Sequence, residues 1–367
     1  MATQVNVAVA IVVAFLVAGV SIVQSFAQAR QPNSCDIFKP GLPTIWIFAF
    51  GGTMTGLRSS ASSTPYASGV IPIWNYIKNV PGLCDIANIR ARDVFWGGSE
   101  DSNATIFQEL ASRIWEDQKN HCMDGIILTH GTDLMESHAY LIDLIYDGTT
   151  PICMVGAMRT DDAPSRDGPE SLLSAASVVV DKNANGRGVM VMSSGKLIHA
   201  RHVRKVHANN LDSFDGGDAG NVGLVVDNKP WFFFPPSRPL RHHAFAVSRP
   251  INESLARVLR AEQISGRTIY RLLREGVEGL VVEGYGAGYL SSEQSRILTT
   301  VLKDLHNFPV VVSSRVQRGI VQAHNYPKGI GAGDLTTDKS RILLAACLTN
   351  GYSWTQINSA FAHGTQA

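Results

Sequence analysis

Hydroxyl and carboxylate side chains are concentrated in three polar turns, each predicted to follow a strand. The groups are Thr53, Ser99 with Glu100, and Thr132 with Asp133. A hydroxyl is a weak nucleophile at its own pKa and is activated by an adjacent base or cation. The pattern therefore favours nucleophilic chemistry at threonine. The alternative is that Thr132 and Asp133 only cap the helix that follows them.

Other catalytic patterns are weak or missing. The sequence contains no G-x-S-x-G elbow, which argues against an ordinary α/β-hydrolase. His199, His202 and His207 match no metal-ligand spacing, so we predict exposed or helix-end histidines and no metal site. The glycines between Gly284 and Gly288 follow a predicted strand but lack the third glycine of a dinucleotide-binding turn.

The reactive turns need a sheet that brings them to one edge. Apolar runs predict buried strands, and helical periodicity separates them. The strands are expected at 44–50, 126–128, 151–155, 188–192 and 196–199, and helices at 103–119 and 170–181. This alternation is typical of an α/β fold with a mostly parallel sheet, in which ligands bind at the carboxyl ends of the strands.

The helix after Asp133 has an apolar face in the sequence. Met135, Ala139, Ile142 and Leu144 share that face, and we place Glu136 and Asp143 outside it. A second expectation concerns residues 57–69, which are rich in Ser, Ala and Gly and include Tyr66. This segment is predicted to be a mobile lid or, alternatively, a plain surface loop.

Composition and length indicate a two-domain protein with a large core. The chain has 367 residues, 45% of them hydrophobic, with 32 basic and 31 acidic side chains. This near-neutral balance gives no argument for nucleic acid or an acidic membrane as partner. We predict a larger N-terminal domain at 42–234, a proline-rich linker at 235–253, and a smaller C-terminal α/β domain at 254–367 with strands at 279–283 and 309–312 and a helix at 338–350.

The first residues read as a targeting segment. Residues 5–23 are apolar throughout, and small residues precede Arg30. We predict a signal peptide over residues 1–29, cleaved near Ala29, and a secreted or periplasmic protein; a retained signal anchor is the alternative, because no positive charge precedes the apolar run.

Five cysteines and two sequons complete the sequence features. One or two disulfides are expected in an oxidising compartment, whereas Cys153 and Cys347 lie in apolar runs and are predicted to be buried thiols. Asn103 and Asn252 begin glycosylation sequons.

Two motifs give the chain a resemblance to a known family. Phe50-Gly-Gly-Thr53-Met-Thr-Gly56 and Asp124-Gly-Ile-Ile-Leu-Thr-His-Gly-Thr-Asp133 resemble the two signatures of the bacterial-type L-asparaginase, or asparaginase/glutaminase, family. Further matching blocks run from Met154 to Arg159, Asp167 to Pro169, Arg201 to Lys205, Ser313 to Val316, and Leu335 to Thr349. The resemblance covers 44–361.

The resemblance implies a role for each motif residue. Thr53 matches the nucleophile and Tyr66 the lid tyrosine that helps to activate it. Ser99 and Glu100 match positions that bind the α-carboxylate and α-amino groups of the substrate. Thr132 matches the second threonine, Asp133 the substrate-binding aspartate, and Lys205 the lysine. Ala157 matches a position whose backbone group lies on the oxyanion side.

The same resemblance implies the overall activity. It indicates an amidohydrolase that converts L-asparagine to L-aspartate and ammonia through an acyl-enzyme, with some L-glutaminase activity. No cofactor or metal is expected, and the expected assembly is a homotetramer with its sites at the interface between subunits.

Two departures from the family pattern motivate alternatives. Where the family has an asparagine in a G-x-G-N turn, this chain has Ala287, and no Asp or Glu occurs between Val310 and Gly333. Both features concern groups that reach a neighbouring subunit. One alternative is therefore an amino-acid-binding protein with impaired turnover, and another is an amidase acting on a different amide.

Overall fold

The computed structural model describes residues 35, 38–60, 65–120, 123–238, 245, 250–305, 307–322 and 329–362. Within it, Gly41–Ala367 forms one compact unit. The apolar run at 5–23 and the predicted cleavage position lie outside the described residues. In the part of the chain that is described, no helix combines the length and apolar character needed to cross a membrane.

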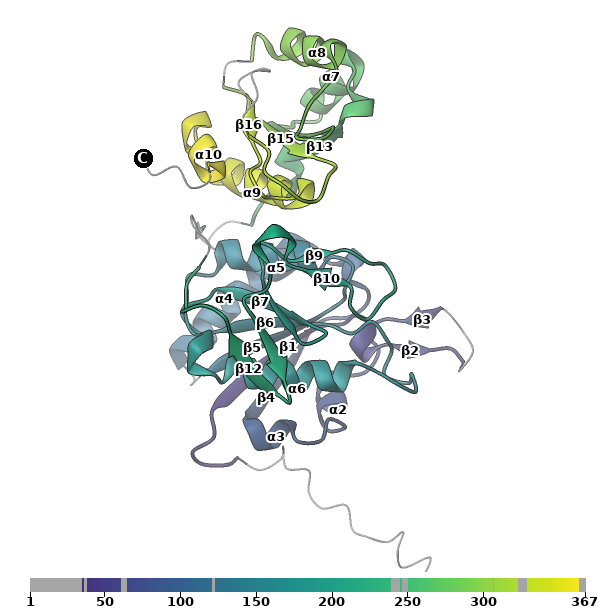
Figure 1. The fold of residues 1–367 in the computed structure, drawn as a ribbon, viewed down its shortest axis with the longest axis vertical. Helices are drawn as coiled ribbons and strands as arrows, with labels where there is room; N and C mark the ends of the chain where they lie inside the picture. Colours follow the sequence, from purple (N-terminus) through teal and green to yellow (C-terminus); the bar gives the residue numbers. More distant parts are fainter. Residues whose placement is uncertain are drawn as a thin grey trace, which may run out of the picture. The chain divides into compact units, whose positions relative to one another are not determined.

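An eight-stranded sheet forms the N-terminal part of this unit (Figure 1). Its order is β12-β11-β8-β7-β6-β5-β1-β4. The bounds are β1 Thr44–Phe50, β4 Asn88–Phe95, β5 Gly125–His130, β6 Ile152–Val155, β7 Val189–Ser193, β8 Lys196–His199, β11 Gly223–Val226 and β12 Lys229–Phe232. The five neighbouring strands β7, β6, β5, β1 and β4 are parallel. The strands β8, β11 and β12 each pair antiparallel with their neighbours. The predicted mostly parallel α/β sheet is confirmed.

Helices cover both faces of this sheet. Alternate residues of β1, including Trp46 and Phe48, belong to one core cluster with side chains of α4 (Ala104–Asn120) and α5 (Met135–Ile145). The helix α6 (Gly168–Val179) packs on β5 and β6. Shorter helices, α2 Ile73–Ile77 and α3 Leu83–Ile86, lie near the edge strand β4.

The helix α5 is buried on nearly every side, contrary to the single apolar face that we expected. It packs against α4, β7 and the C-terminal helix α9 (Thr337–Thr349). Asp143, placed outside the apolar face in the sequence, is only 3% exposed. Its carboxylate accepts a hydrogen bond from the Val189 amide at 3.0 Å, which offsets the cost of burying a charge.

A four-stranded parallel sheet forms the C-terminal part. Its order is β13-β14-β15-β16, with bounds Ala256–Arg260, Gly279–Gly284, Val310–Ser314 and Ile330–Gly331. Four helices belong to it: α7 Gly266–Arg274, α8 Ser292–Leu302, α9, and α10 Trp354–Phe361. Two short antiparallel pairs complete the strands of the described residues, β2 Leu57–Arg58 with β3 Tyr66–Ala67, and β9 Arg204–Lys205 with β10 Phe214–Asp215.

The structure describes two free and two disulfide-bonded cysteines. Cys153 and Cys347 are free and buried, which confirms the prediction of buried thiols, and Cys35 and Cys84 are disulfide-bonded. The two sequon asparagines serve local turns. The Asn103 side chain accepts a hydrogen bond from the Thr105 amide, and the Asn252 side chain accepts one from the Ser254 amide.

Candidate active site

The three polar turns meet because their strands are neighbours. In the large sheet β1 lies between β5 and β4, and all three run parallel. Their carboxyl ends therefore share one edge, which brings the turns after Phe50, Phe95 and His130 together. This is the edge at which the sequence predicted the site.

Glycines allow the turns to touch. Gly51 and Gly52 have positive φ angles of 58° and 82°. A Cβ atom on Gly52 would lie 2.6 Å from the Cα atom of Gly131, and one on Gly51 would lie 2.4 Å from the carbonyl oxygen of Gly97. The Gly52 amide also donates to the Gly97 carbonyl at 2.9 Å. Any side chain at these positions would force apart the backbones that carry Thr53, Thr132 and Ser99.

Thr53 and Tyr66 form the first pair of site residues. Thr53 lies in the 3-10 turn η2 (Thr53–Thr55) and is 7% exposed. Its Oγ1 atom is 2.7 Å from the Tyr66 hydroxyl, and either oxygen can donate. Tyr66 lies on β3 and is 43% exposed. The predicted lid segment therefore reaches the predicted nucleophile through one hydrogen bond.

Thr132, Asp133 and Lys205 form the second group. The Lys205 Nζ atom donates to Thr132 Oγ1 at 3.0 Å and to Asp133 Oδ1 at 2.6 Å. Lys205 lies on β9, 73 residues along the chain from Thr132, and only 15% of its side chain is exposed. A cation at this distance favours the alkoxide character of the threonine.

The capping alternative for this turn is wrong. The N-cap residue of α5 is Leu134, whose own side chain makes no capping hydrogen bond, so neither Thr132 nor Asp133 is the cap. Instead, Glu136 in the first turn of α5 accepts a hydrogen bond from the Lys205 backbone amide at 2.5 Å. Glu136 was not among the predicted site residues. The only sequence signal was an acidic side chain three residues after Asp133.

Ser99 and Glu100 occupy the third turn, η3 (Ser99–Asp101). Ser99 is 2% exposed and lies against Gly131, where a Cβ atom would come within 2.9 Å of its Oγ. The same Oγ accepts a hydrogen bond from the Leu134 amide at 3.3 Å. Glu100 is exposed, with its carboxylate folded over Gly98.

Ala157 follows β6 and is 2% exposed. It borders, with Gly156 and Thr132, a cavity of about 230 Å³ whose other lining side chains include Met135, Met192 and Phe214. Neither Thr53 nor Ser99 belongs to this lining, so the cavity extends from the Thr132 side of the site.

Asp167 holds the turn that carries Ala157. Its carboxylate accepts hydrogen bonds from the backbone amides of Met158 and Arg159, at 2.8 and 3.0 Å. The sequence placed Asp167 in a matching block, but its role in the turn could be seen only from the structure.

Two buried histidines support the second group. The Gly131 carbonyl can only accept, so the contact of 2.6 Å makes His130 Nδ1 the donor. His130 Nε2 then accepts from His138 Nδ1 at 3.0 Å, which assigns a tautomer to both rings. Burial lowers the pKa of His130 to about 4 and that of His138 to about 2, so both rings are neutral near pH 7.

The three histidines considered as metal ligands each contact a different partner. His199 is 2% exposed, which contradicts the prediction of an exposed or helix-end residue, and its Nδ1 accepts from the Arg201 amide. His202 contacts Asp334, and exposed His207 accepts from the Asn209 amide. No group of three or more potential metal ligands occurs among the residues that the structure describes.

Family profiles match both parts of the chain. The profile described as "Asparaginase, N-terminal" matches residues 44–238, and "Glutaminase/Asparaginase C-terminal domain" matches residues 259–361. The chain belongs to the asparaginase family. It is therefore a hydrolase of the amidohydrolase class, as the two signatures indicated. The exact boundaries of the predicted domains and linker stay a prediction.

Individual relatives agree with the family assignment. "Probable L-asparaginase 1" of Schizosaccharomyces pombe is 32% identical over 356 residues, which cover 96% of this chain and 98% of the relative. "L-asparaginase 2" of Escherichia coli is 33% identical and covers 87% of this chain and 93% of the relative. A crystal structure of a "Probable Cytoplasmic L-asparaginase" from Campylobacter jejuni is 33% identical, covers 87% of this chain and 99% of its own, and superposes with a TM-score of 0.77. The asparaginase fold is thus confirmed over both domains.

The structural relative corrects our prediction of location. A secreted or periplasmic protein was expected, yet the similar solved structure is that of a probable cytoplasmic enzyme. The expectation is therefore wrong on this comparison. It rested on the apolar composition of residues 5–23 and on the small residues before Arg30, a pattern that cannot by itself distinguish an export signal from other apolar leaders.

The turn after β14 carries one departure from the family pattern. By the family resemblance, Ala287 stands where the asparagine of the G-x-G-N turn is expected. The neighbouring Tyr289 is 63% exposed, and its backbone pairs with Tyr285 across the turn.

Proposed function

We propose that this protein hydrolyses L-asparagine to L-aspartate and ammonia, using Thr53 as nucleophile. The main support is that two activated threonines lie at neighbouring strand ends: Thr53 bonded to Tyr66, and Thr132 bonded to Lys205. Their loops are in backbone contact through Gly52 and Gly131. Family membership supports the same assignment.

The substrate is a zwitterion, and the site offers groups of both signs. Asp133, whose side chain is 68% exposed, and Glu100 face the α-ammonium group. Ser99 and nearby backbone amides face the α-carboxylate. These contacts hold the side-chain carboxamide beside Thr53, and such orientation lowers the barrier by prepaying translational and rotational entropy.

In the first step, the Thr53 oxygen bonds to the carboxamide carbon. The Thr53 proton passes through the Tyr66 contact to the amide nitrogen, the C–N bond breaks, and ammonia leaves. Backbone donors near Thr132 and Ala157 stabilise the oxyanion that forms in between. One such donor typically contributes about 3 kcal/mol.

In the second step, water cleaves the acyl ester. Thr132, held as an alkoxide by the Lys205 ammonium, takes a proton from the attacking water. The carbon–oxygen bond to Thr53 breaks, the proton taken from the water returns to the Thr53 oxygen, and L-aspartate leaves. Every proton transfer uses side chains of this chain, so the proposed reaction includes no cofactor.

The proposal includes two finer points. Some L-glutaminase activity is expected by family resemblance, since Glu100 occupies the amino-group position. A homotetramer with sites between subunits is also proposed. Light scattering coupled to gel filtration tests the assembly, and a fully active monomer would contradict it.

The central test compares three threonine-to-valine variants, which keep shape and remove one hydroxyl each. Thr53→Val and Thr132→Val should each lower ammonia release from L-asparagine by at least about 10³-fold, the scale of losing a covalent nucleophile or its base. Thr129→Val is the matched control, because Thr129 is the penultimate residue of β5, the strand that precedes Thr132, and its buried hydroxyl has no hydrogen-bond partner in the described residues.

The outcomes separate the proposal from its main rival. Full activity in Thr53→Val would overturn the assignment. Calorimetric binding of L-asparagine by the unmodified protein with no ammonia release would instead favour an amino-acid-binding protein, the reading motivated by Ala287 and by the absence of Asp or Glu between Val310 and Gly333.

A further inference from the structure

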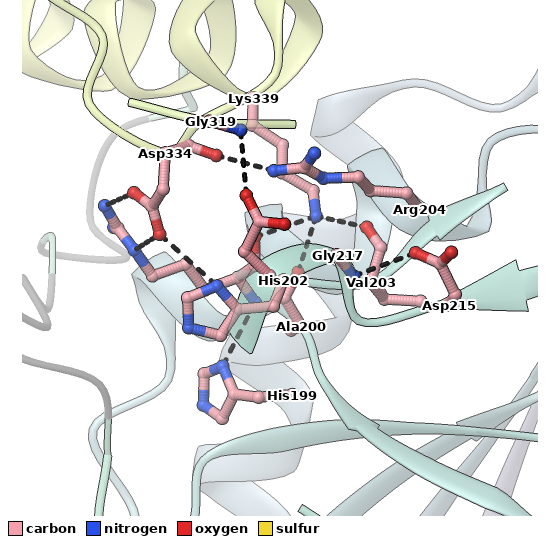
Figure 2. Close-up of polar contacts among 12 residues, drawn as sticks. His199, Ala200, His202, Val203, Arg204, Asp215, Gly217, Gly319, Asp334 and Lys339 are labelled. Carbon is pink, nitrogen blue, oxygen red and sulfur yellow. Dashed lines mark hydrogen bonds and ion pairs between the residues drawn. The ribbon is translucent and has the colours of Figure 1, made fainter. Parts of the chain in front are cut away.

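Lys339 is a fully buried cation that the proposed reaction does not use. It lies in the first turn of α9, in the C-terminal domain, and is 0% exposed. Its Nζ atom donates to the backbone carbonyls of Ala200, Arg201 and Val203, at 2.9, 2.9 and 2.5 Å (Figure 2). All three carbonyls belong to the loop between β8 and β9.

The number of donors matches the number of acceptors. A lysine ammonium has three N–H donors, and here each meets one carbonyl. A neutral amine or an apolar side chain would leave at least one buried carbonyl without a donor, which is costly in a low-dielectric interior. The three carbonyls are thereby held in one arrangement.

This loop ends at the lysine of the active site. Val203 is followed by Arg204 and Lys205, which form β9, and the Lys205 ammonium contacts Thr132 and Asp133. The backbone position of Val203 therefore sets where β9 begins. A shift of about 1 Å at such a position can change a rate by roughly 10²-fold.

Asp334 of the C-terminal domain holds the same loop from a second side. Its carboxylate pairs with the Arg201 guanidinium at 2.7 and 3.3 Å and contacts His202 Nδ1 at 3.3 Å. Its backbone carbonyl accepts from Arg204 Nη2 at 2.8 Å. Figure 2 shows Lys339 and Asp334 reaching the loop from the C-terminal domain.

The C-terminal domain also contacts β10, the strand that pairs with β9, and the turn after it. Residue Phe214 of β10 pairs with Lys205, and Asp215 pairs with Arg204. The Asp215 carboxylate in turn pairs with Arg318 of the C-terminal domain at 2.6 Å, and the Gly319 amide donates to Asp218 at 2.8 Å. Contacts from the C-terminal domain thus precede and follow Lys205.

We propose that Lys339 is a positioning residue through which the C-terminal domain sets the geometry of Lys205 in its own chain. Asp334 assists it by fixing Arg201 and Arg204. The inference rests on the proposed function of Lys205. It gives the C-terminal domain a role in this chain's own site, separate from any role at an interface between subunits.

Charged groups of both signs lie around Lys339. Burial lowers the pKa of Lys339 to about 7; Glu136 and Asp334 raise it, and Arg204 and Arg201 lower it further. The ring of Tyr140 on α5 lies 5.9 Å from the ammonium. Glu136, which accepts from the Lys205 amide, is thus electrostatically linked to both lysines.

The test compares two buried substitutions on α9. Lys339→Met keeps the length of the side chain and removes the three donors; kcat should fall by roughly 10- to 100-fold with KM changed less than threefold, because orientation of Lys205 acts on the chemical step. Leu344→Ala removes a buried apolar contact of the same helix, beside Gly279 and away from the loop, and should keep kcat. Thermal unfolding of both variants is measured alongside.

Chemical rescue distinguishes positioning from general support. Lys339→Ala removes the chain from Cγ to Nζ, which propylammonium can replace and 1-propanol cannot replace in charge or donor number. We expect propylammonium to restore kcat at least fivefold, followed as L-aspartate formation so that the added amine does not interfere.

The inference is overturned if folded Lys339→Met keeps wild-type kcat, if Leu344→Ala loses as much kcat, or if propylammonium and propanol act alike. Should Lys339→Met fail to fold, Asp334→Asn decides through the same kcat and KM comparison. Lys205→Met is measured in parallel. Full activity there would refute the proposed function itself, whereas an inactive Lys205→Met with an active Lys339→Met refutes only the role of Lys339.

Discussion

The two halves of the candidate site are built in different ways. The Thr53 half depends on one side-chain hydrogen bond to Tyr66, a residue 43% exposed on a two-residue strand. The Thr132 half has contacts on several sides. The Lys205 ammonium is hydrogen-bonded to Thr132 and Asp133, and the Lys205 amide donates to Glu136. The turn before Thr132 is held by the His130–His138 pair.

This difference indicates that the two halves of the site have different roles. The Thr132 half is preorganised before substrate arrives, because several contacts hold it and they come from elements distant in sequence. The Thr53 half is completed by Tyr66 on an exposed strand, and the role of this segment as a mobile lid stays a prediction. Rigid support suits the group that must hold a charge in place, since electrostatic stabilisation works best when the surrounding groups need not reorganise.

The largest effect should come from titrating the buried histidines of the rigid half. The pKa of His130 is lowered to about 4 from 6.5, so between these pH values the unfolded chain binds a proton that the folded chain does not. Stability should be independent of this group above pH 6.5 and fall by about 3 kcal/mol as the pH drops to 4, at 1.36 kcal/mol per pKa unit.

Urea unfolding at several pH values between 7 and 4 measures this loss. His138→Gln keeps a donor toward His130 and removes one of the two titrating rings, so its stability should fall less steeply with acid than that of the parent. Equal slopes for both proteins would show that the pair does not govern the acid sensitivity of this half.

Tyr66→Phe tests the open half. Loss of the hydroxyl removes the proton path from Thr53, and kcat should fall roughly 10²-fold, the lower range for general acid–base catalysis. Stability should change little, because Tyr66 is substantially exposed. Ammonia release and thermal unfolding measured on the same preparation check both parts. A large loss of stability would mean that the hairpin is structural and that the contrast between the halves is false.

The fold was predictable where strands are buried on both faces. The apolar runs of β1, β5, β6 and β7 were located from sequence within one or two residues. The strand β4 escaped notice because it is an edge strand whose Arg90, Arg92 and Asp93 interrupt the apolar pattern. The hairpin β11–β12 was also missed, although Asp227-Asn228, both with positive φ, had the composition of a two-residue hairpin turn.

Only the candidate site residues that lie in family motifs could be predicted from the sequence. Family resemblance located Thr53, Thr132 and Lys205, and the neighbouring positions of β1, β4 and β5 explain why their turns meet. The support around Lys205 was not predictable, because Glu136 lies 69 residues away and Lys339 contacts a carbonyl 139 residues earlier. Such pairings follow from how helices pack on sheets, which the spacing of residues along the chain does not encode.

The smallest effect should come from the base of the exposed hairpin. Arg58 on β2 donates to the Asp162 carboxylate at 3.3 Å and to the Asp162 carbonyl at 2.9 Å, which ties the hairpin that carries Tyr66 to the loop after β6. The pKa of Asp162 is lowered, first by a hydrogen bond from the Thr160 side chain and then by Arg58. Because the pair is partly exposed, salt screens it and its contribution is small.

Arg58→Gln should therefore lower kcat/KM for L-asparagine by only about threefold, in the range of surface ion pairs. The effect should shrink further at high salt, since salt already weakens the pair in the parent protein. Arg271→Gln is the matched control, because Arg271 of α7 forms an exposed pair at 2.9 Å with Glu275, the C-cap residue of that helix, outside the site residues. If Arg58→Gln instead reduced activity as strongly as Tyr66→Phe, closure of the hairpin would depend on this one contact, and the open half would be as firmly anchored as the buried one.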